Sequence, residues 1–170
     1  MPTSNLSVWP YILNAIWSLH PNVVLDVGPG WGKAGLLLRE YVDPNIQVDA
    51  VELWEPYITP RLRSLYENVY HDDVVSWQSE QFNPYDLILL GDVIEHIEKE
   101  AGKQLLERIQ PAMVVCTPVE FFESIDYPPT ELHISHWTME DFTSIGASVN
   151  QEALAMGALV ATIPEKNGRR

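Results

Sequence analysis

Short runs of apolar residues alternate along the chain with longer segments whose apolar positions recur every three or four residues. The short runs have the length and the β-branched composition of buried strands. A pair of strands with a tight turn near Met156 and Gly157 is predicted at the C-terminal end. The other predicted strands cover residues 22–28, 46–53, 69–74, 85–92 and 112–118.

The segments between these runs have helical periodicity, with apolar positions on one face. Ser7 is expected to cap the first helix, and Pro10 falls in its first turn, where a missing N–H is tolerated. Residues 119–137 are predicted to be irregular. The predicted helices cover residues 8–19, 32–42, 60–68, 93–109 and 138–146.

Strands that alternate with helices indicate a mostly parallel sheet covered by helices on both faces. The strand pair at residues 148–164 breaks this alternation, and it therefore suggests a last strand that runs antiparallel to the others. We expect a seven-stranded Rossmann-like α/β sheet with a reversed last strand. At 170 residues, the chain is expected to form one domain over residues 1–170.

The charge of the chain restricts its partners. Acidic residues outnumber basic ones 24 to 10, which gives a net charge of −14. A nucleic-acid partner and an anionic membrane both require a basic surface, so neither is expected. No segment has the length of a transmembrane helix, and the first residues lack the features of a signal peptide. We therefore expect a cytoplasmic protein.

A glycine-rich loop, "VLDVGPGWG", follows the first predicted strand. Gly28, Gly30 and Gly32 allow a sharp turn and a close approach of a ligand to the backbone. A dinucleotide site would have glycine where this chain has Lys33, which weakens a pyrophosphate-binding interpretation.

Acidic side chains mark the carboxyl ends of the first three predicted strands. Asp26 lies just before the glycines, Glu52 ends the second strand, and Asp72 and Asp73 follow the third. An acid at the position of Glu52 can accept hydrogen bonds from the two hydroxyls of a ribose. The set is typical of a site for a ligand with a ribose, an amino group and a positive centre.

This constellation resembles the class I S-adenosylmethionine-dependent methyltransferases over roughly residues 8–164. "LDVGPGWG" is similar to the first motif of that family, "VELWEPY" to the acidic end of its second strand, and "YDLILLGDVIEHI" to its fourth-strand motif. The resemblance implies S-adenosyl-L-methionine as cofactor and methyl transfer to oxygen or nitrogen of a small or medium-sized acceptor as the activity. A macromolecular acceptor such as a protein, and a homodimer that completes the acceptor pocket, stay open.

The resemblance also implies roles for individual residues. Asp26, Gly28 and Gly30 would hold the methionine end of the cofactor, and Glu52, with Leu53 beside it, would take the ribose hydroxyls. The remaining cofactor contacts would be Asp72, Asp73 and Val74 near the adenine and Gly91 and Asp92 along the methionine part.

A base for the acceptor would lie at the carboxyl ends of the fourth and fifth strands. His96, His133 and His136 are the predicted catalytic residues, because histidine exchanges protons near neutral pH. The acceptor pocket is expected to include the first helix, the turn at residues 92–96 and the irregular stretch. Its predicted lining residues are Trp9, Tyr11, Phe121, Phe122, Tyr127, His133, His136 and Trp137.

The stretch "LLGDVIEHIEKE" at residues 89–100 has two interpretations. As a capped helix, it would use Asp92 as the N-cap, Glu95 at capping-box spacing, and a Glu95–Lys99 pair on its surface. As a metal site, it would offer Asp92, Glu95 and His96 on one helical face, with His133 as a further ligand. The second interpretation rests on a similarity to small-RNA 2′-O-methyltransferases, which have an E-x-x-E-H motif; the first is preferred, and no metal is assigned.

The sequence therefore leaves three functional hypotheses open. The leading one is a methyltransferase for a small or medium-sized acceptor. The alternatives are a metal-assisted 2′-O-methyltransferase and a non-catalytic module that keeps the fold as a cofactor-binding or partner subunit. A nicotinamide-dependent oxidoreductase is disfavoured by Lys33 and by the reversed last strand.

Overall fold

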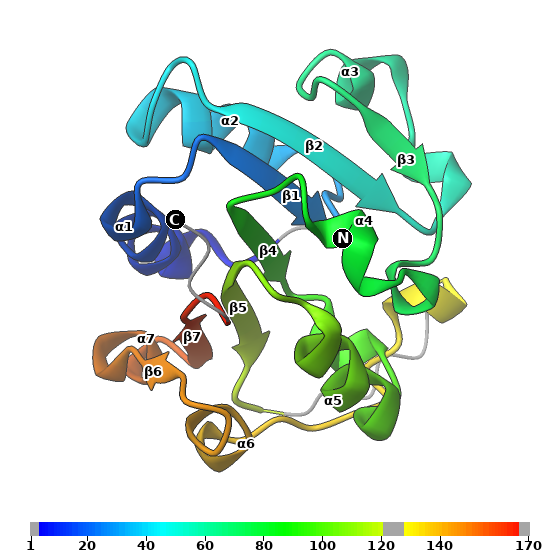
Figure 1. Cartoon of the computed structure of the whole chain (residues 1–170). Coiled ribbons are helices and arrows are strands. Elements are labelled where there is room, and N and C mark those ends of the chain that lie inside the picture. The colour runs from blue at the N-terminus through cyan, green and yellow to red at the C-terminus, as the bar shows by residue number, and fades with distance from the viewer. Residues whose placement is uncertain (1–3, 121–127, 167–170) are drawn as a thin grey trace.

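The computed structural model describes residues 4–120 and 128–166, which form a seven-stranded sheet in the order β3-β2-β1-β4-β5-β7-β6 (Figure 1). Strands β1 to β5 are mutually parallel, whereas β7 runs antiparallel to both β5 and β6. The predicted fold class is confirmed. The strands are β1 (Val23–Val27), β2 (Gln47–Glu52), β3 (Val69–His71), β4 (Leu87–Gly91), β5 (Ala112–Pro118), β6 (Ser148–Val149) and β7 (Ala158–Ile163).

Helices connect these strands, and within the described part of the chain no helix combines the length and the apolar character needed to cross a membrane. The α-helices are α1 (Trp9–Leu19), α2 (Lys33–Tyr41), α3 (Pro60–Arg63), α4 (Ser79–Phe82), α5 (Lys99–Arg108), α6 (Met139–Thr143) and α7 (Gln151–Ala155). The 3-10 helices are η1 (Leu6–Val8), η2 (Glu55–Tyr57), η3 (Val74–Ser76), η4 (Ile94–His96) and η5 (Pro129–Glu131).

Alternating side chains along the strands divide the core into two layers. In β4, Leu87 and Leu89 face α1, α2 and α7, while Ile88 and Leu90 face α5 and α6. Both faces of the central strands are apolar, as expected for parallel strands covered on both sides. Helices pack on the two faces of the sheet, as Figure 1 shows.

Two local predictions were wrong, and a third, the antiparallel strand pair at the C-terminal end, is confirmed except for its connection. Ser7 does not cap α1; its N–H donates to the Asn5 side chain, which caps η1 instead. The helix predicted over residues 60–68 is reduced to the single turn of α3. The predicted strand pair near the C-terminus is also altered, because Asn150 accepts hydrogen bonds from Glu152 N and Ala153 N and thereby begins α7 after only two strand residues.

The helix predicted over residues 93–109 is broken, so the capped-helix interpretation of residues 89–100 is wrong. Asp92 has φ 53°, in the left-handed region, and does not act as an N-cap. Glu98 caps α5 instead, because its carboxylate accepts hydrogen bonds from Glu100 N and Ala101 N. Lys99 pairs with Asp141 at 2.8 Å rather than with Glu95. Glu95 is thereby left without the structural role predicted for it.

The stretch after η5 is anchored to η4 through Trp137. The indole Nε1 donates to the Ile94 carbonyl at 3.1 Å and to Ser135 Oγ at 2.8 Å. The ring is buried, stacks on Phe142, and lies against Gly102 of α5. These contacts fix the chain that carries His133 beside the chain that carries Glu95.

This anchor generates a prediction about Gly102→Ala. The added Cβ would lie 2.7 Å from Trp137 Cζ2, and the hydrogen-bonded indole has little freedom to move away. Although alanine favours helix more than glycine does, we expect the free energy of unfolding to fall by about 1–3 kcal/mol. Chemical denaturation monitored by circular dichroism measures this change.

Gly91→Ala is the matched control, because its added Cβ would have Ser4 Oγ, at 3.9 Å, as its nearest neighbour. Its free energy of unfolding should change by less than about 1 kcal/mol. Equal stability of the Gly102→Ala variant and the original protein would show that Trp137 is not held as described.

Candidate functional site

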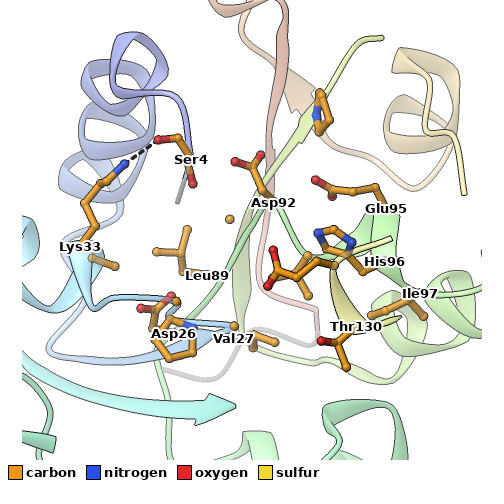
Figure 2. A pocket seen from close by; sticks show the side chains of 18 of the residues that line it. Ser4, Asp26, Val27, Lys33, Leu89, Asp92, Glu95, His96, Ile97 and Thr130 are labelled. Atoms are coloured by element: carbon orange, nitrogen blue, oxygen red, sulfur yellow. Dashed lines mark hydrogen bonds between the residues drawn. The ribbon is translucent and has the colours of Figure 1, made fainter. Parts of the chain in front are cut away.

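One cavity of about 700 Å³ opens at the carboxyl ends of β1, β2 and β4. The chain leaves β1 and β4 in opposite directions along the sheet, because β2 and β5 lie on their outer sides. Open α/β sheets bind ligands at such a switch point. In Figure 2, Lys33 and Ser4 lie on one side of this cavity, Glu95 and His96 on the other, and Asp92 between them.

The glycine loop forms the floor of the cavity next to β1. Gly28 and Gly30 have φ values of 64° and 53°, which non-glycine side chains rarely adopt. A Cβ on Gly28 would also lie 2.7 Å from a methyl group of Val93. The loop therefore requires glycine at Gly28 for two reasons, and its backbone lies open to a ligand.

Two buried carboxylates follow the loop into the cavity. Asp26 is 3% exposed and accepts a hydrogen bond of 2.6 Å from the Tyr66 hydroxyl. Burial raises the pKa of Asp26 to about 7, although the Tyr66 hydrogen bond partly opposes the shift. Glu52 is 6% exposed and accepts a hydrogen bond of 2.7 Å from Trp54 N, and burial raises its pKa as well.

Asp92 occupies the turn after β4. A left-handed φ at a non-glycine residue is strained, and such strain is concentrated at functional sites. The Asp92 carboxylate accepts a long hydrogen bond, 3.6 Å, from the Cys116 thiol. Burial raises the pKa of Asp92, while hydrogen bonds and the charge of Lys33 act in the opposite direction.

Glu95, His96 and His133 form a cluster on the far side of Asp92. Their candidate donor atoms all lie within 4.8 Å of one another. Glu95 is 2% exposed, and neither of its carboxylate oxygens has a hydrogen bond of normal geometry to a described residue, although the Thr117 hydroxyl is close enough to lower its pKa. Burial, and to a lesser degree the charge of Asp92, raises the pKa of Glu95 well above its usual range.

Backbone hydrogen bonds hold this cluster together. The Glu95 carbonyl accepts from Ile134 N at 2.9 Å and from Ser135 N at 3.0 Å. His96 Nδ1 lies 3.0 Å from the Leu132 carbonyl, and the His96 and His133 rings contact each other edge to face. Residues 132–135 thus run along η4, which places His133 beside His96.

The structure brings most of the predicted site residues to this one cavity. Their roles remain predictions. Those that line it are Asp26, Gly28, Gly30, Glu52, Leu53, Asp72, Asp73, Val74, Gly91, Asp92, His96 and His133, together with Trp9 of the expected acceptor pocket.

Of the expected residues, three do not line the cavity and three lie outside the described part of the chain. His136 is exposed, its Nε2 lies 3.1 Å from the Val119 carbonyl, and it is absent from the lining. Trp137 belongs to the core beneath α5, because its indole finds partners there. Tyr11 packs against the core of the α1 face. Phe121, Phe122 and Tyr127 lie outside the described residues.

Sequence reasoning did not predict that Lys33 lines the cavity. Its ammonium donates to the Ser4 carbonyl, lies 5.6 Å from the centre of the Trp9 ring, and lines the cavity (Figure 2). Lys33 is the one lysine or arginine among the described residues of the lining, which include eight acids. The only signal in the sequence was the position of Lys33 directly after the glycine loop, where a dinucleotide-binding motif has its third glycine.

Comparison with known proteins places these features in context. No family model matches the chain. A tRNA1(Val) (adenine(37)-N6)-methyltransferase of Salmonella enteritidis PT4 is 33% identical over 91 residues, which cover 46% of this chain and 36% of that protein. The corresponding protein of Escherichia fergusonii is 31% identical over 72 residues, or 38% and 29% of the two chains. The chain thus spans about a third of the length of these relatives.

Solved structures match the chain over most of its length. The small RNA methyltransferase HEN1 has a TM-score of 0.67 at 16% identity, covering 100% of this chain and 27% of that one. The DhpI complex with S-adenosylhomocysteine has a TM-score of 0.67 at 16% identity and covers 95% and 86%. A methyltransferase of Aquifex aeolicus has a TM-score of 0.57 at 18% identity and covers 94% of both chains. The chain therefore has the fold of the class I S-adenosylmethionine-dependent methyltransferases.

Proposed function

We propose that the protein binds S-adenosyl-L-methionine in the cavity above β1, β2 and β4 and transfers its methyl group to an oxygen or nitrogen acceptor. The observation that carries this proposal is the convergence of the glycine loop, Glu52, Asp72–Val74 and Asp92 on one cavity at the switch point of the sheet. The volume, about 700 Å³, falls within the range of pockets for ligands of this size. The fold supports the same assignment.

The buried acids suit the chemistry of this cofactor. Glu52, oriented by the N–H of Trp54, would accept hydrogen bonds from the ribose hydroxyls. Asp26 would face the ammonium of the methionine part, and Asp72, Asp73 and Val74 would surround the adenine. A cationic ligand relieves the cost of burying carboxylates that have few internal partners.

The cofactor supplies a methyl group on a sulfonium, which is a good leaving group. The protein has to align the acceptor with that methyl group and exclude water. His96 lies on the side of Asp92 away from Lys33 (Figure 2), and the His133 ring contacts the His96 ring. Both line the cavity, and they are the proposed bases for an acceptor that must lose a proton. His136 is left out of this proposal because it does not line the cavity.

The charge around the cavity favours a neutral or cationic acceptor. The lining contains eight acids and one lysine among its described residues, and the chain carries a net charge of −14. Such a surface repels phosphates. The curated relatives are named for a tRNA acceptor, so a nucleic acid is the second candidate, but the charge argues for a small or medium-sized acceptor instead.

Glu52→Ala tests cofactor binding. Removing a charged acceptor of hydrogen bonds should cost about 1.5–3 kcal/mol, so the affinity for S-adenosylmethionine should fall about 10–100-fold. Isothermal titration calorimetry measures this affinity directly. Glu55→Gln, at a neighbouring exposed acid outside the cavity lining, should bind as the original protein does. A Glu52→Ala variant that binds with unchanged affinity would contradict the proposed ribose contact.

The pH dependence of binding tests Asp26. An acid whose pKa is raised to about 7 is largely protonated below that pH, and only its ionised form attracts the ammonium. Affinity should therefore rise as pH increases, by about tenfold between about pH 6 and pH 8 if only the ionised form binds.

Asp26→Asn provides the reference for this measurement, because its pH profile contains the titration of the ligand but not that of residue 26. The difference between the two calorimetric profiles should be centred near pH 7. Parallel profiles for the two proteins would show that Asp26 does not face the charge of the cofactor.

A further inference from the structure

The cluster of Glu95, His96 and His133 has the composition and compactness of a metal-binding site. One carboxylate and two imidazoles offer donor atoms that all lie within 4.8 Å of one another. Asp92 is not part of this group, and its carboxylate accepts a hydrogen bond from the Cys116 thiol. The chain therefore offers three donors on one side of the cavity and not the four suggested by the sequence.

Glu95 is an independent indication of a ligand. Its side chain is almost completely buried, and the Thr117 hydroxyl and the Glu95 N–H lower its pKa without forming hydrogen bonds of normal geometry to either carboxylate oxygen. A buried polar group of this kind costs free energy unless a partner satisfies it. A cation between Glu95 and the two imidazoles would be such a partner.

The hydrogen bond of His96 determines which ring nitrogen can bind a cation. The Leu132 carbonyl, 3.0 Å from Nδ1, can only accept, so Nδ1 must carry the proton. Nε2 then has a free lone pair. Metal-binding histidines usually make such a second hydrogen bond to a carbonyl or carboxylate, which orients the ring.

The backbone holds the donors in place before any ligand arrives. Ile134 N and Ser135 N donate to the Glu95 carbonyl, while Ser135 Oγ and the Trp137 indole donate to the Ile94 carbonyl. These bonds attach the residues after His133 to η4, and the contact of His96 Nδ1 with the Leu132 carbonyl attaches the residue before it. Preorganised donors lose little conformational freedom when they bind a cation.

We propose that Glu95, His96 and His133 bind a divalent transition-metal cation whose open coordination positions face the cavity and take an oxygen atom of the methyl acceptor. Two imidazoles and one carboxylate favour cations such as Mn²⁺, Fe²⁺, Co²⁺ or Zn²⁺ over Mg²⁺ and Ca²⁺, which prefer oxygen ligands. All three residues line the cavity, so the positions not taken by the protein are open to the acceptor.

The identity of the acceptor atom rests on the proposed function, whereas the metal site does not. A hydroxyl bound to the cation loses its proton to water more readily. Its oxygen then forms the bond to the methyl carbon as the carbon–sulfur bond breaks, with both electrons of that bond going to sulfur. In this arrangement His96 and His133 act as ligands instead of bases, and the acceptor is an alcohol or a phenol.

Titration of the chelator-treated protein with Co²⁺ tests the site, since bound Co²⁺ gives a visible ligand-field spectrum. We expect saturation at one ion per chain, competition by Zn²⁺ and Mn²⁺, and little competition by Mg²⁺. Each of three variants should weaken Co²⁺ binding by at least about 100-fold: Glu95→Gln, His96→Asn and His133→Asn. Loss of a residue that only orients a ligand can weaken binding by about that factor, and loss of the ligand itself should weaken it at least as much. Circular dichroism and thermal unfolding verify that each variant is folded.

His136→Asn is the matched control, because His136 lies three residues from His133 but outside both the cluster and the cavity lining. It should bind Co²⁺ as the original protein does. The proposal is overturned if the folded protein does not bind Co²⁺, or if binding survives in all three cluster variants. It is also overturned if His136→Asn is equally impaired.

The same titration distinguishes this proposal from the proposed function. Glu52→Ala should lose affinity for S-adenosylmethionine and keep its Co²⁺ spectrum, since Glu52 is not in the cluster. Intact Co²⁺ binding in a protein without affinity for S-adenosylmethionine would support the metal site and overturn the methyltransferase proposal. Binding of S-adenosylmethionine without binding of Co²⁺ would support the methyltransferase proposal and overturn the metal site.

Discussion

The burial of carboxylates at the carboxyl edge of the sheet is the constraint on which the rest of the site depends. Asp26, Glu52 and Glu95 are each less than a tenth exposed, and charges withdrawn from water need partners. The protein supplies the Tyr66 hydroxyl to Asp26 and the Trp54 N–H to Glu52, but no described residue forms a hydrogen bond of normal geometry to the Glu95 carboxylate. A cavity built in this way is completed by positively charged ligands. The proposed cofactor carries such charges, and so does the proposed metal ion.

The fold provides the geometry that makes this burial possible. The parallel strands β1, β2 and β4 end at one edge of the sheet, and the chain leaves β1 and β4 in opposite directions, which opens a space above that edge. Hydrogen bonds from Ser135 and Trp137 to the Ile94 carbonyl then attach the segment of His133 to η4. Sheet topology thus fixes the cofactor side of the cavity, while a small set of local anchors fixes the acceptor side.

Sequence patterns predicted the sheet and most of the cofactor side because both depend on strong, local signals. Apolar runs, the glycine loop and acids at strand ends need no knowledge of distant contacts. The turn at Asp92 was mispredicted, because Asp92 and Glu95 imitate a capping box although the helix begins later, at the cap provided by Glu98. The contact of His133 with His96 depends on backbone hydrogen bonds between segments about 37 residues apart, which no short-range pattern encodes. The positions of His136 and Trp137 outside the cavity could not be predicted for the same reason, because they depend on contacts with Val119 and Ile94, which are distant in the sequence.

The central claim is that the cofactor lies across the switch point with its sulfur directed toward the Glu95–His96–His133 side. A crystal structure of the complex with S-adenosylhomocysteine is the most direct test. The account predicts that the ribose hydroxyls lie within hydrogen-bond distance of the Glu52 carboxylate and that the sulfur lies between Asp92 and that cluster. A ligand bound outside this cavity, or one whose ribose lies away from Glu52, would contradict it.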